Sequence, residues 1–391
     1  MRRNADFMAR HLKRFGWEYV VVDIQWYEPE AASFSYRPFA KLCMDGFSRL
    51  IPAENRFPSA ANGKGFAPLA DYIHSLGLKF GIHIMRGVPR QAVHAGTPIL
   101  GSTATARDIA RDSICAWNTD MYGVDPEAAG AKEYYESLFS LYAAWGVDFI
   151  KCDDICRELP QAEKELELIS RCLRSCGRDM VLSLSPGPAL LEAAELYRKT
   201  ANMWRITDDF WDDWQLLYDM FRRADAWSAF SSPGGWPDAD MLPIGPVRRN
   251  EDKSQWTRFT QAEQKTMMTL WCAFRSPLMI GGDMTGFDEF TLGLLTNPGI
   301  LEMHRLARRA HQAKRLKDEK GELVIWTADR EGGGGYAALF NLGNEPRELI
   351  PGRELGLPKG KPLADLWSGV TVPSWDSVTL EPHGAAACRI G

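Results

Sequence analysis

The stretch VDFIKCD, residues 147–153, decides the fold class, because it is a short apolar run that ends in a carboxylate. A strand that is buried on both faces has this composition, as in parallel sheets covered by helices. A helical pattern, Ala131 to Trp145, directly precedes the run. The stretch is therefore predicted to be a strand of a (β/α) barrel, with Asp153 at its carboxyl end, where such barrels keep their chemistry.

The same order of helix and strand repeats along most of the chain. Strands are predicted at residues 19–24, 79–85, 147–153, 180–184, 203–207, 241–244 and 278–281, each preceded by a helical pattern. Such alternation is typical of parallel βα units. Seven units are visible, whereas a complete TIM barrel has eight strands. We therefore predict an α/β fold of the (β/α)8 TIM-barrel type that lacks its first strand.

The composition changes from about Arg315 onward. Short β-rich runs at residues 323–327, 336–340, 363–367 and 377–380 are separated by turns that contain Gly and Pro. This arrangement is typical of an antiparallel β-sandwich. The chain of 391 residues is therefore expected to contain a catalytic barrel, residues 1–310, and a C-terminal antiparallel β domain, residues 311–391.

The charge and hydropathy pattern excludes several classes of protein. A net charge of -5 without a basic stripe argues against a nucleic-acid partner. No apolar run of about 18 residues is present, so no membrane partner is expected. Residues 1–6 lead into an amphipathic stretch instead of a signal-peptide core, which predicts a cytoplasmic location for the chain as written.

The cysteines do not predict a metal site. Cys152, Cys156, Cys172 and Cys176 form two C-x3-C pairs, without the C-x2-C spacing of zinc ribbons. Reduced thiols with a structural role are favoured, and neither a metal nor a cofactor is expected. The sequence does not decide between a monomer and a homo-oligomer.

Two aspartates are the candidates for catalysis. Asp153 ends one predicted strand, and Asp209 follows another strand two βα units later. A retaining glycosidase needs one carboxylate as nucleophile and one carboxylic acid as proton donor, about 5 to 5.5 Å apart. Lys151 lies two positions before Asp153, so both side chains point to the same face and the lysine charge favours an ionised carboxylate. Arg205 lies near Asp209, and the paired donors of its guanidinium can bind sugar hydroxyls. Because of the two aspartates and these cations, a sugar hydrolase is the leading hypothesis.

Other side chains compete for roles at this end of the barrel. The loop GGWPDADM, residues 234–241, is acidic and aromatic, and the ring of Trp236 suits the apolar face of a sugar. A tight turn that closes the barrel is the alternative for this loop. His83 also lies near the end of a predicted strand, but a lone histidine is more often structural, and it is given no role. Four further aspartates serve equally well as helix N-caps, namely Asp154, Asp208, Asp212 and Asp213.

Together these stretches resemble glycoside hydrolase family 27, which contains retaining α-galactosidases, α-N-acetylgalactosaminidases and β-L-arabinopyranosidases. The resemblance spans about residues 15–308 and is carried by residues 19–23, 77–82, 145–153, 204–205 with 209, 236–242 and 276–280. It implies that Asp153 is the nucleophile and Asp209 the acid/base. It also implies sugar contacts for Asp23, Lys151, Arg205 and Asp240, and a C-terminal antiparallel β domain. Trp26, in the aromatic segment after the first visible strand, and Trp236 complete the expected contacts with a small or oligosaccharide substrate.

One departure from the family concerns the substrate. Galactose-cleaving members typically have a second Asp directly after the position of Asp23, where it binds the outer hydroxyls, but this chain has Ile24. β-L-Arabinopyranose has the ring configuration of galactose without the hydroxymethyl group, and Ile24 would fill that space. A hydroxyl left unpaired costs roughly 1 to 3 kcal/mol, about ten- to a hundredfold in selectivity. A β-L-arabinopyranosidase with weak α-galactosidase activity is the resulting hypothesis.

Two further departures concern the strands. Residues 184–187 read LSPG where family members often have Cys-Glu-Trp, so one selectivity contact is unassigned. No strand precedes the N-terminal helix, although family members begin with a Trp-containing strand. A truncated gene model is the favoured explanation, and a lost leader would change the expected location.

Three alternatives stay open. An ordinary α-galactosidase is supported by the motifs and opposed by Ile24. A catalytically silent carbohydrate-binding protein is opposed by the presence of both candidate aspartates. A metal-dependent barrel enzyme is ranked lower, because adjacent aspartates such as Asp153 and Asp154 point different ways on a strand.

Overall fold

The computed structural model describes residues 1–32, 35–250, 253–374 and 376–391. These residues form two compact units, one mainly of Met1–Arg205 and the other mainly of Ile206–Arg249 and Ser254–Gly391. Among the helices of the described ranges, none combines the length and the apolar composition that crossing a membrane requires.

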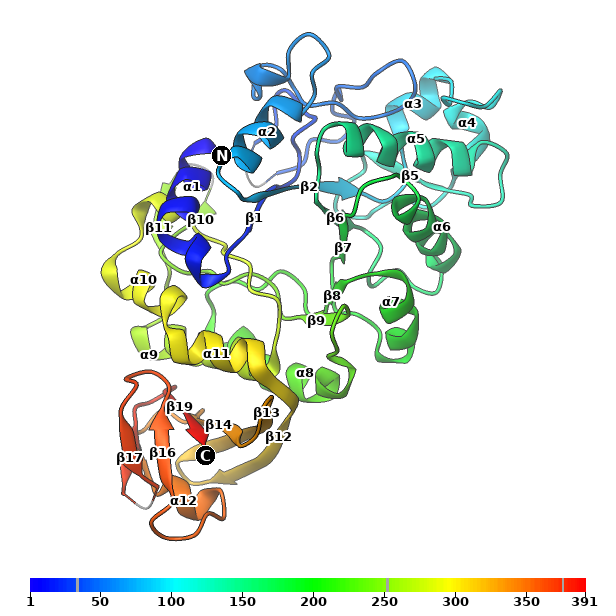
Figure 1. Ribbon diagram of the computed structural model, residues 1–391. Coiled ribbons are helices and arrows are strands. Elements are labelled where there is room, and N and C mark those ends of the chain that lie inside the picture. The colour runs from blue at the N-terminus through cyan, green and yellow to red at the C-terminus, as the bar shows by residue number, and fades with distance from the viewer. Residues whose placement is uncertain (33–34, 251–252, 375) are drawn as a thin grey trace. The chain divides into compact units, whose positions relative to one another are not determined.

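The first unit is built on a parallel sheet. Its strands, in spatial order, are β1 (Tyr19–Val22), β2 (Lys79–Met85), β6 (Phe149–Asp153), β7 (Val181–Leu184) and β8 (Met203–Arg205). The helices between them lie on the outer side, namely α2 (Ala67–Ser75), α5 (Ala131–Ala144), α6 (Glu163–Arg174) and α7 (Ala194–Thr200) (Figure 1). The predicted α/β barrel class is confirmed.

The register of this sheet decides which side chains meet at its carboxyl end. His83 of β2 lies opposite Lys151 of β6, and Met85 lies opposite Asp153. Paired positions of parallel strands share a face, and so do positions two apart on one strand. His83, Lys151 and Asp153 therefore face the same side of the sheet.

The chain around β1 and β2 contains elements that periodicity did not predict. After β2 comes a small antiparallel sheet of β3 (Val88–Pro89), β5 (Met121–Val124) and β4 (Ala110–Arg111), with helices α3 (Arg90–Ala95) and α4 (Ala106–Ile109). Such short strands give no periodic signal. The predicted N-terminal helix is observed as α1 (Arg2–Phe7), which continues through a π-helical and a 3-10 turn to Phe15.

The second unit begins with the later βα elements. They are α8 (Trp214–Trp227), β9 (Trp236–Asp238), α9 (Gln261–Phe274), α10 (Glu289–Thr296) and α11 (Pro298–Leu306), and a two-stranded ribbon pairs β10 (Pro246–Asn250) with β11 (Lys253–Trp256). The strands predicted at 241–244 and 278–281 are reduced to one parallel bridge between Leu242 and Ile280. The N–H of Ile244, which would extend this pairing, instead donates to the carbonyl oxygen of Leu242 in a tight turn around Pro243.

The C-terminal part is a β-sandwich, as predicted. The larger antiparallel sheet has the order β12 (Ala307–Asp318), β13 (Gly321–Arg330), β14 (Gly335–Asn341), β19 (Ala385–Ile390), β16 (Pro362–Asp365) and β17 (Thr371–Pro373). The smaller sheet pairs β15 (Arg347–Leu349) with β18 (Val378–Leu380), and α12 (Pro351–Glu354) follows β15. Leu349 and Leu380 pack against Leu323, Ile325 and Leu339 of the larger sheet to form a buried core. The strand β12 was not predicted, because its many charged residues mask its half-buried face.

Candidate active site

Asp153 ends β6 and is almost completely buried, with 7% of its surface exposed. Its Oδ2 lies 3.1 Å from Nε2 of His83, and its Oδ1 accepts a hydrogen bond of 3.1 Å from the backbone N–H of Asp154. Burial acts to raise the pKa of Asp153, but the bond from His83 and two nearby cations outweigh it and hold this pKa well below its usual value. The cations are Lys151 and Arg205. The carboxylate is therefore ionised at ordinary pH, which is the form that a nucleophile requires.

Lys151 links Asp23 to this cluster. Its Nζ lies 3.2 and 3.4 Å from the two carboxylate oxygens of Asp23. Although 60% of the Asp23 side chain is exposed, the surrounding protein partly desolvates it and so acts to raise its pKa; the charges of Lys151 and His83 overcome this and lower the pKa. The carboxylate of Asp23 thus stays charged and keeps lone pairs for further donors, such as sugar hydroxyls.

His83 is the residue that the sequence analysis missed. It is completely buried on β2, and its Nδ1 has no hydrogen-bond partner among the described residues. Its contact with Asp153 requires Nε2 to carry a proton, since a carboxylate only accepts. The sequence does contain a signal for this role of His83, because His83 and Lys151 each stand two positions before the end of a predicted strand. Aligning the two strand ends would have placed His83 beside the nucleophile.

Trp26 lies behind this cluster and has no exposed surface. Its Nε1 donates a hydrogen bond of 2.7 Å to the backbone carbonyl oxygen of His83. Its ring makes edge contacts with Phe66 and Trp145, at centroid distances of 5.2 and 6.3 Å. The indole therefore supports the strand that carries His83. Ile24, by contrast, is half-buried and keeps part of its surface open.

Asp209 belongs to the second unit and is exposed. The backbone N–H of the next residue, Phe210, donates a hydrogen bond of 2.8 Å to Oδ2 of Asp240. Asp240 has a φ of 74°, and its carbonyl oxygen accepts a hydrogen bond of 2.9 Å from Nε1 of Trp271. Asp240 thus fixes the backbone beside Asp209.

Arg205 and Trp236 complete the predicted set. Arg205 ends β8 with 3% of its surface exposed, and its carbonyl oxygen accepts a hydrogen bond of 2.9 Å from the N–H of Ala189. Trp236 begins β9 and is half-buried. The guanidinium of Arg275 lies over the Trp236 ring, 4.6 Å from its centre. One face of this ring is therefore covered by the arginine.

The neighbouring aspartates have other partners. Asp213 is the N-cap of α8, because its side chain accepts a hydrogen bond of 2.8 Å from the N–H of Gln215. Asp208 accepts a hydrogen bond of 3.2 Å from the N–H of Asp209. Asp154 pairs with Arg86 at 2.8 Å. The N-cap alternative is thus confirmed for Asp213.

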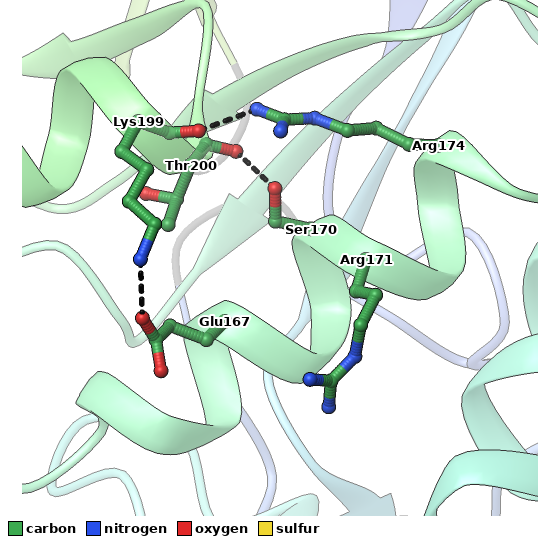
Figure 2. Close-up of a pocket in the computed structure, with 6 residues that line it drawn as sticks. All are labelled: Glu167, Ser170, Arg171, Arg174, Lys199 and Thr200. Carbon is green, nitrogen blue, oxygen red and sulfur yellow. Dashed lines mark hydrogen bonds and ion pairs between the residues drawn. The ribbon is translucent and has the colours of Figure 1, made fainter.

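A surface hollow of about 280 Å³ lies between α6 and α7 on the outer side of the first unit (Figure 2). It is lined by Glu167, Ser170, Arg171, Arg174, Lys199 and Thr200. Lys199 pairs with Glu167 at 3.0 Å, and Arg174 donates a hydrogen bond of 2.5 Å to the carbonyl oxygen of Lys199. The hollow is formed by helices, away from the carboxyl ends of the strands, and we assign it no role.

Two family models match the chain. The model described as alpha galactosidase A matches residues 126–305, and the model described as the alpha galactosidase C-terminal beta sandwich domain matches residues 320–390. Alpha-galactosidase 2 of Arabidopsis thaliana is 25% identical over 397 residues, which cover 100% of this chain and 83% of the relative.

Solved structures include more similar proteins. A family 27 β-L-arabinopyranosidase from Geobacillus stearothermophilus is 52% identical, with a TM-score of 0.94, and the match covers 99% of this chain and 91% of that one. A variant of that enzyme in complex with arabinose is 51% identical, also with a TM-score of 0.94, over 100% of this chain and 92% of the other.

Proposed function

The chain belongs to glycoside hydrolase family 27, and from this membership we propose that it removes terminal β-L-arabinopyranosyl groups with retention of configuration. The family makes it a glycoside hydrolase for galactose-configured sugars. The observation that carries the proposal is the buried, ionised Asp153, held by His83 and flanked by Lys151. Such a carboxylate has the charge and the fixed orientation that attack on an anomeric carbon requires.

In the proposed reaction, a carboxylate oxygen of Asp153 forms a bond to the anomeric carbon while the bond to the leaving oxygen breaks. Asp209 gives its proton to that leaving oxygen. In the second step, Asp209 takes a proton from water, and the resulting hydroxide displaces Asp153 from the sugar. Two inversions at one carbon give net retention.

Among the remaining candidates, Asp23 and Arg205 are proposed to act on the sugar beside the nucleophile. Asp23, held by Lys151, offers charged acceptors for ring hydroxyls, and a hydrogen bond to a charged group contributes roughly 1.5 to 3 kcal/mol. Arg205 adds positive charge near the nucleophile. Asp240 fixes the backbone beside Asp209. The sugar contact expected for Trp26 is not proposed, because this side chain has no exposed surface and instead supports His83. Trp236 remains a proposed sugar contact, with one face of its ring covered by Arg275.

Ile24 carries the proposed substrate preference. Its half-buried apolar side chain follows Asp23 directly and provides no acceptor for a hydroxymethyl group. A pentopyranose has no such group, so it leaves no hydroxyl unpaired. The similarity to a β-L-arabinopyranosidase at 52% identity supports the same preference.

The test compares p-nitrophenyl β-L-arabinopyranoside with p-nitrophenyl α-D-galactopyranoside. We expect kcat/KM to favour the arabinoside by about ten- to a hundredfold, the range that one unpaired hydroxyl provides. Proton NMR of the first-formed arabinose should show the anomeric configuration of the substrate. A preference for the galactoside would instead support the second candidate, an α-galactosidase, which the names of the 25%-identical relatives favour.

We also propose that the catalytic barrel comprises residues 1–310 and the β domain residues 311–391. The last helix before the sandwich, α11, ends at Leu306, and β12 begins at Ala307, four residues before the proposed β domain. Expression of residues 311–391 alone tests the boundary: a cooperative thermal transition is expected, and an unfolded product would contradict an independent domain.

A further inference from the structure

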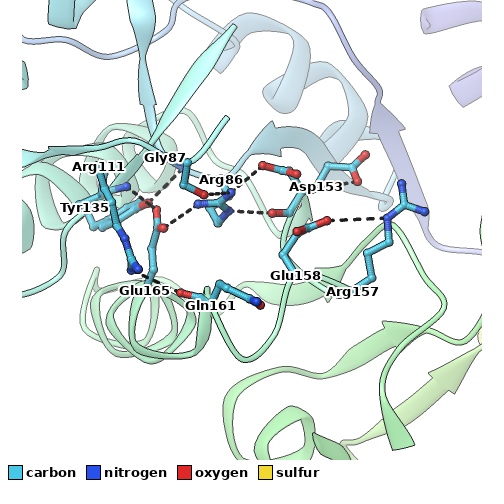
Figure 3. Close-up of polar contacts among 12 residues, drawn as sticks. Arg86, Gly87, Arg111, Tyr135, Asp153, Arg157, Glu158, Gln161 and Glu165 are labelled. Atoms are coloured by element: carbon cyan, nitrogen blue, oxygen red, sulfur yellow. Dashed lines mark hydrogen bonds and ion pairs between the residues drawn. The ribbon is translucent and has the colours of Figure 1, made fainter. Parts of the chain in front are cut away.

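Arg86 directly follows β2, contacts the backbone of Asp153, and is buried, with 4% of its surface exposed. Its guanidinium pairs with Asp154 at 2.8 Å. It also pairs with Glu165 at 3.0 Å (Figure 3). The same side chain donates from Nε to the carbonyl oxygen of Asp154 at 2.7 Å. Arg86 therefore binds both the backbone carbonyl and the side-chain carboxylate of Asp154. Only a guanidinium has its donors arranged in a rigid fork that can make both bonds at once.

Asp154 has a backbone conformation that needs such support. Its φ is 59°, in the left-handed region that non-glycine residues enter at a cost. The backbone N–H of Asp154 donates a hydrogen bond to Oδ1 of Asp153, at 3.1 Å. The backbone N–H of Arg86 also donates to the carbonyl oxygen of Asp153, at 3.0 Å. The peptide between Asp153 and Asp154 is thus held from both sides.

Glu165 anchors Arg86 from the opposite direction. Its carboxylate accepts hydrogen bonds from the hydroxyl of Tyr135 at 2.6 Å and from the N–H of Val124 at 3.1 Å. Burial raises the pKa of Glu165 and of Asp154, and the positive charge of Arg86 opposes both shifts. The guanidinium is therefore shared between two buried carboxylates. If it left either of them, that carboxylate would remain buried without its ion-pair partner.

We propose that Arg86 is a positioning residue for the nucleophile: through its bonds to Asp154 and to the carbonyl oxygen of Asp153, it fixes the peptide whose N–H orients the Asp153 carboxylate. This positioning role of Arg86 is separate from the proton transfers of the reaction. The inference rests on the proposed role of Asp153. Catalytic sites often contain unusual backbone conformations that the surrounding contacts enforce. Such conformations orient the reacting groups before the substrate binds.

The first test replaces Arg86 by lysine, which keeps the charge but loses the fork. The substrate is 2,4-dinitrophenyl β-L-arabinopyranoside, or the matching α-galactoside if the parent prefers it, because its leaving group needs no proton. Formation of the glycosyl-enzyme then depends on Asp153 and not on Asp209. We expect Arg86→Lys to slow this step by about a hundredfold, the effect of a small misplacement of a reacting group. The dissociation constant of free sugar should change by less than about threefold, since a merely loosened fold would weaken binding as well.

Arg178→Lys is the matched control. Arg178 binds the other end of the β6 region in the same way, with Nε donating to the carbonyl oxygen of Val147 at 2.8 Å and its guanidinium pairing with Asp148 at 2.5 Å. Its replacement should leave glycosyl-enzyme formation within about twofold of the parent, because this end of the strand carries no reacting group. Equal losses in both variants would overturn the proposal in favour of a general effect on the fold.

If Arg86→Lys does not fold, a pair of variants at Asp154 tests the proposal instead. Asn tolerates the left-handed region and keeps an acceptor, whereas Ala does neither. Asp154→Asn should therefore stay within about fivefold of the parent, and Asp154→Ala should fall by about a hundredfold at unchanged sugar affinity. Equal rates for the two variants, or a parental rate in Arg86→Lys, would refute the positioning role. Failure of the proposed function looks different, because an Asp153→Ala variant would then retain the activity of the parent.

Discussion

Nε2 of His83 lies 3.1 Å from Oδ2 of Asp153, and both side chains are buried on neighbouring parallel strands. Burial acts to raise the pKa of Asp153, and the bond from His83 is the strongest of the influences that lower it. His83 thus helps to keep Asp153, the proposed nucleophile, charged in a buried environment that by itself would favour the neutral carboxylic acid.

Replacement of His83 by leucine should therefore raise the pKa of Asp153. In the parent, Asp153 stays ionised as the pH falls, because its pKa lies well below the usual value. Loss of a hydrogen bond to a charged group costs roughly 1.5 to 3 kcal/mol, so the acidic limb of kcat/KM should move up by about 1 to 2 pH units. The pH profile of kcat/KM is the measurement. His83→Gln, which retains a donor, should shift the limb less, and identical profiles for parent and leucine variant would contradict this role.

The two catalytic aspartates should be distinguishable by azide rescue. Removing the nucleophile with Asp153→Ala should lower kcat by at least about a thousandfold, and added azide should give a glycosyl azide of inverted configuration. Asp209→Ala should accumulate the glycosyl-enzyme with activated substrates, and azide should then give a product of retained configuration. Product configuration is read by proton NMR. Retained product from the Asp153 variant would reverse the two assignments.

Ile24→Asp should move the specificity toward galactosides. The introduced carboxylate supplies the acceptor that a hydroxymethyl group needs, a change of roughly 1 to 3 kcal/mol in the relative barrier. The ratio of kcat/KM for the arabinoside and the galactoside should fall by about tenfold or more. Ile24→Val, which changes volume without adding an acceptor, is the control and should keep the parental ratio within about threefold. An unchanged ratio in the aspartate variant would remove Ile24 from substrate selection.

Asp148, at the amino-terminal end of the β6 region, should stabilise the fold in a pH-dependent manner. Its Oδ2 accepts hydrogen bonds from the N–H of Phe80 at 2.8 Å and from His74 at 2.7 Å, and its Oδ1 pairs with Arg178. Burial acts to raise the pKa of Asp148, but these partners outweigh it and lower the pKa. A carboxylate with a lowered pKa in the folded state stabilises the protein above the pKa of the unfolded state, and this contribution is lost as the pH falls through the folded value.

Urea unfolding of Asp148→Asn should therefore show a smaller free energy of unfolding than the parent near neutral pH. The two proteins should converge as the medium becomes acidic. Asp179→Asn, at an exposed carboxylate nearby, is the control and should follow the parent throughout. A constant difference at every pH would show that the charge of Asp148 is not the cause.

The sequence predicted much of the fold and the residue types of the site. The apolar runs that become β2 and β6 could be located because burial on both faces requires continuous apolar residues. It did not predict the short strands β3 and β4, which have too few residues for a periodic pattern, or β12, whose exposed face is charged. His83 was missed for a different reason: its significance lies in its partner on another strand.

What the sequence by itself determined is the order of helices and strands and the presence of carboxylates at strand ends, because local periodicity follows from which faces are buried. The tertiary structure alone decided the strand register that brings His83 to Asp153, the burial of Trp26 behind it, and the grip of Arg86 on Asp154. These contacts join residues far apart in the chain, and their distances depend on how whole strands align, which no local pattern specifies.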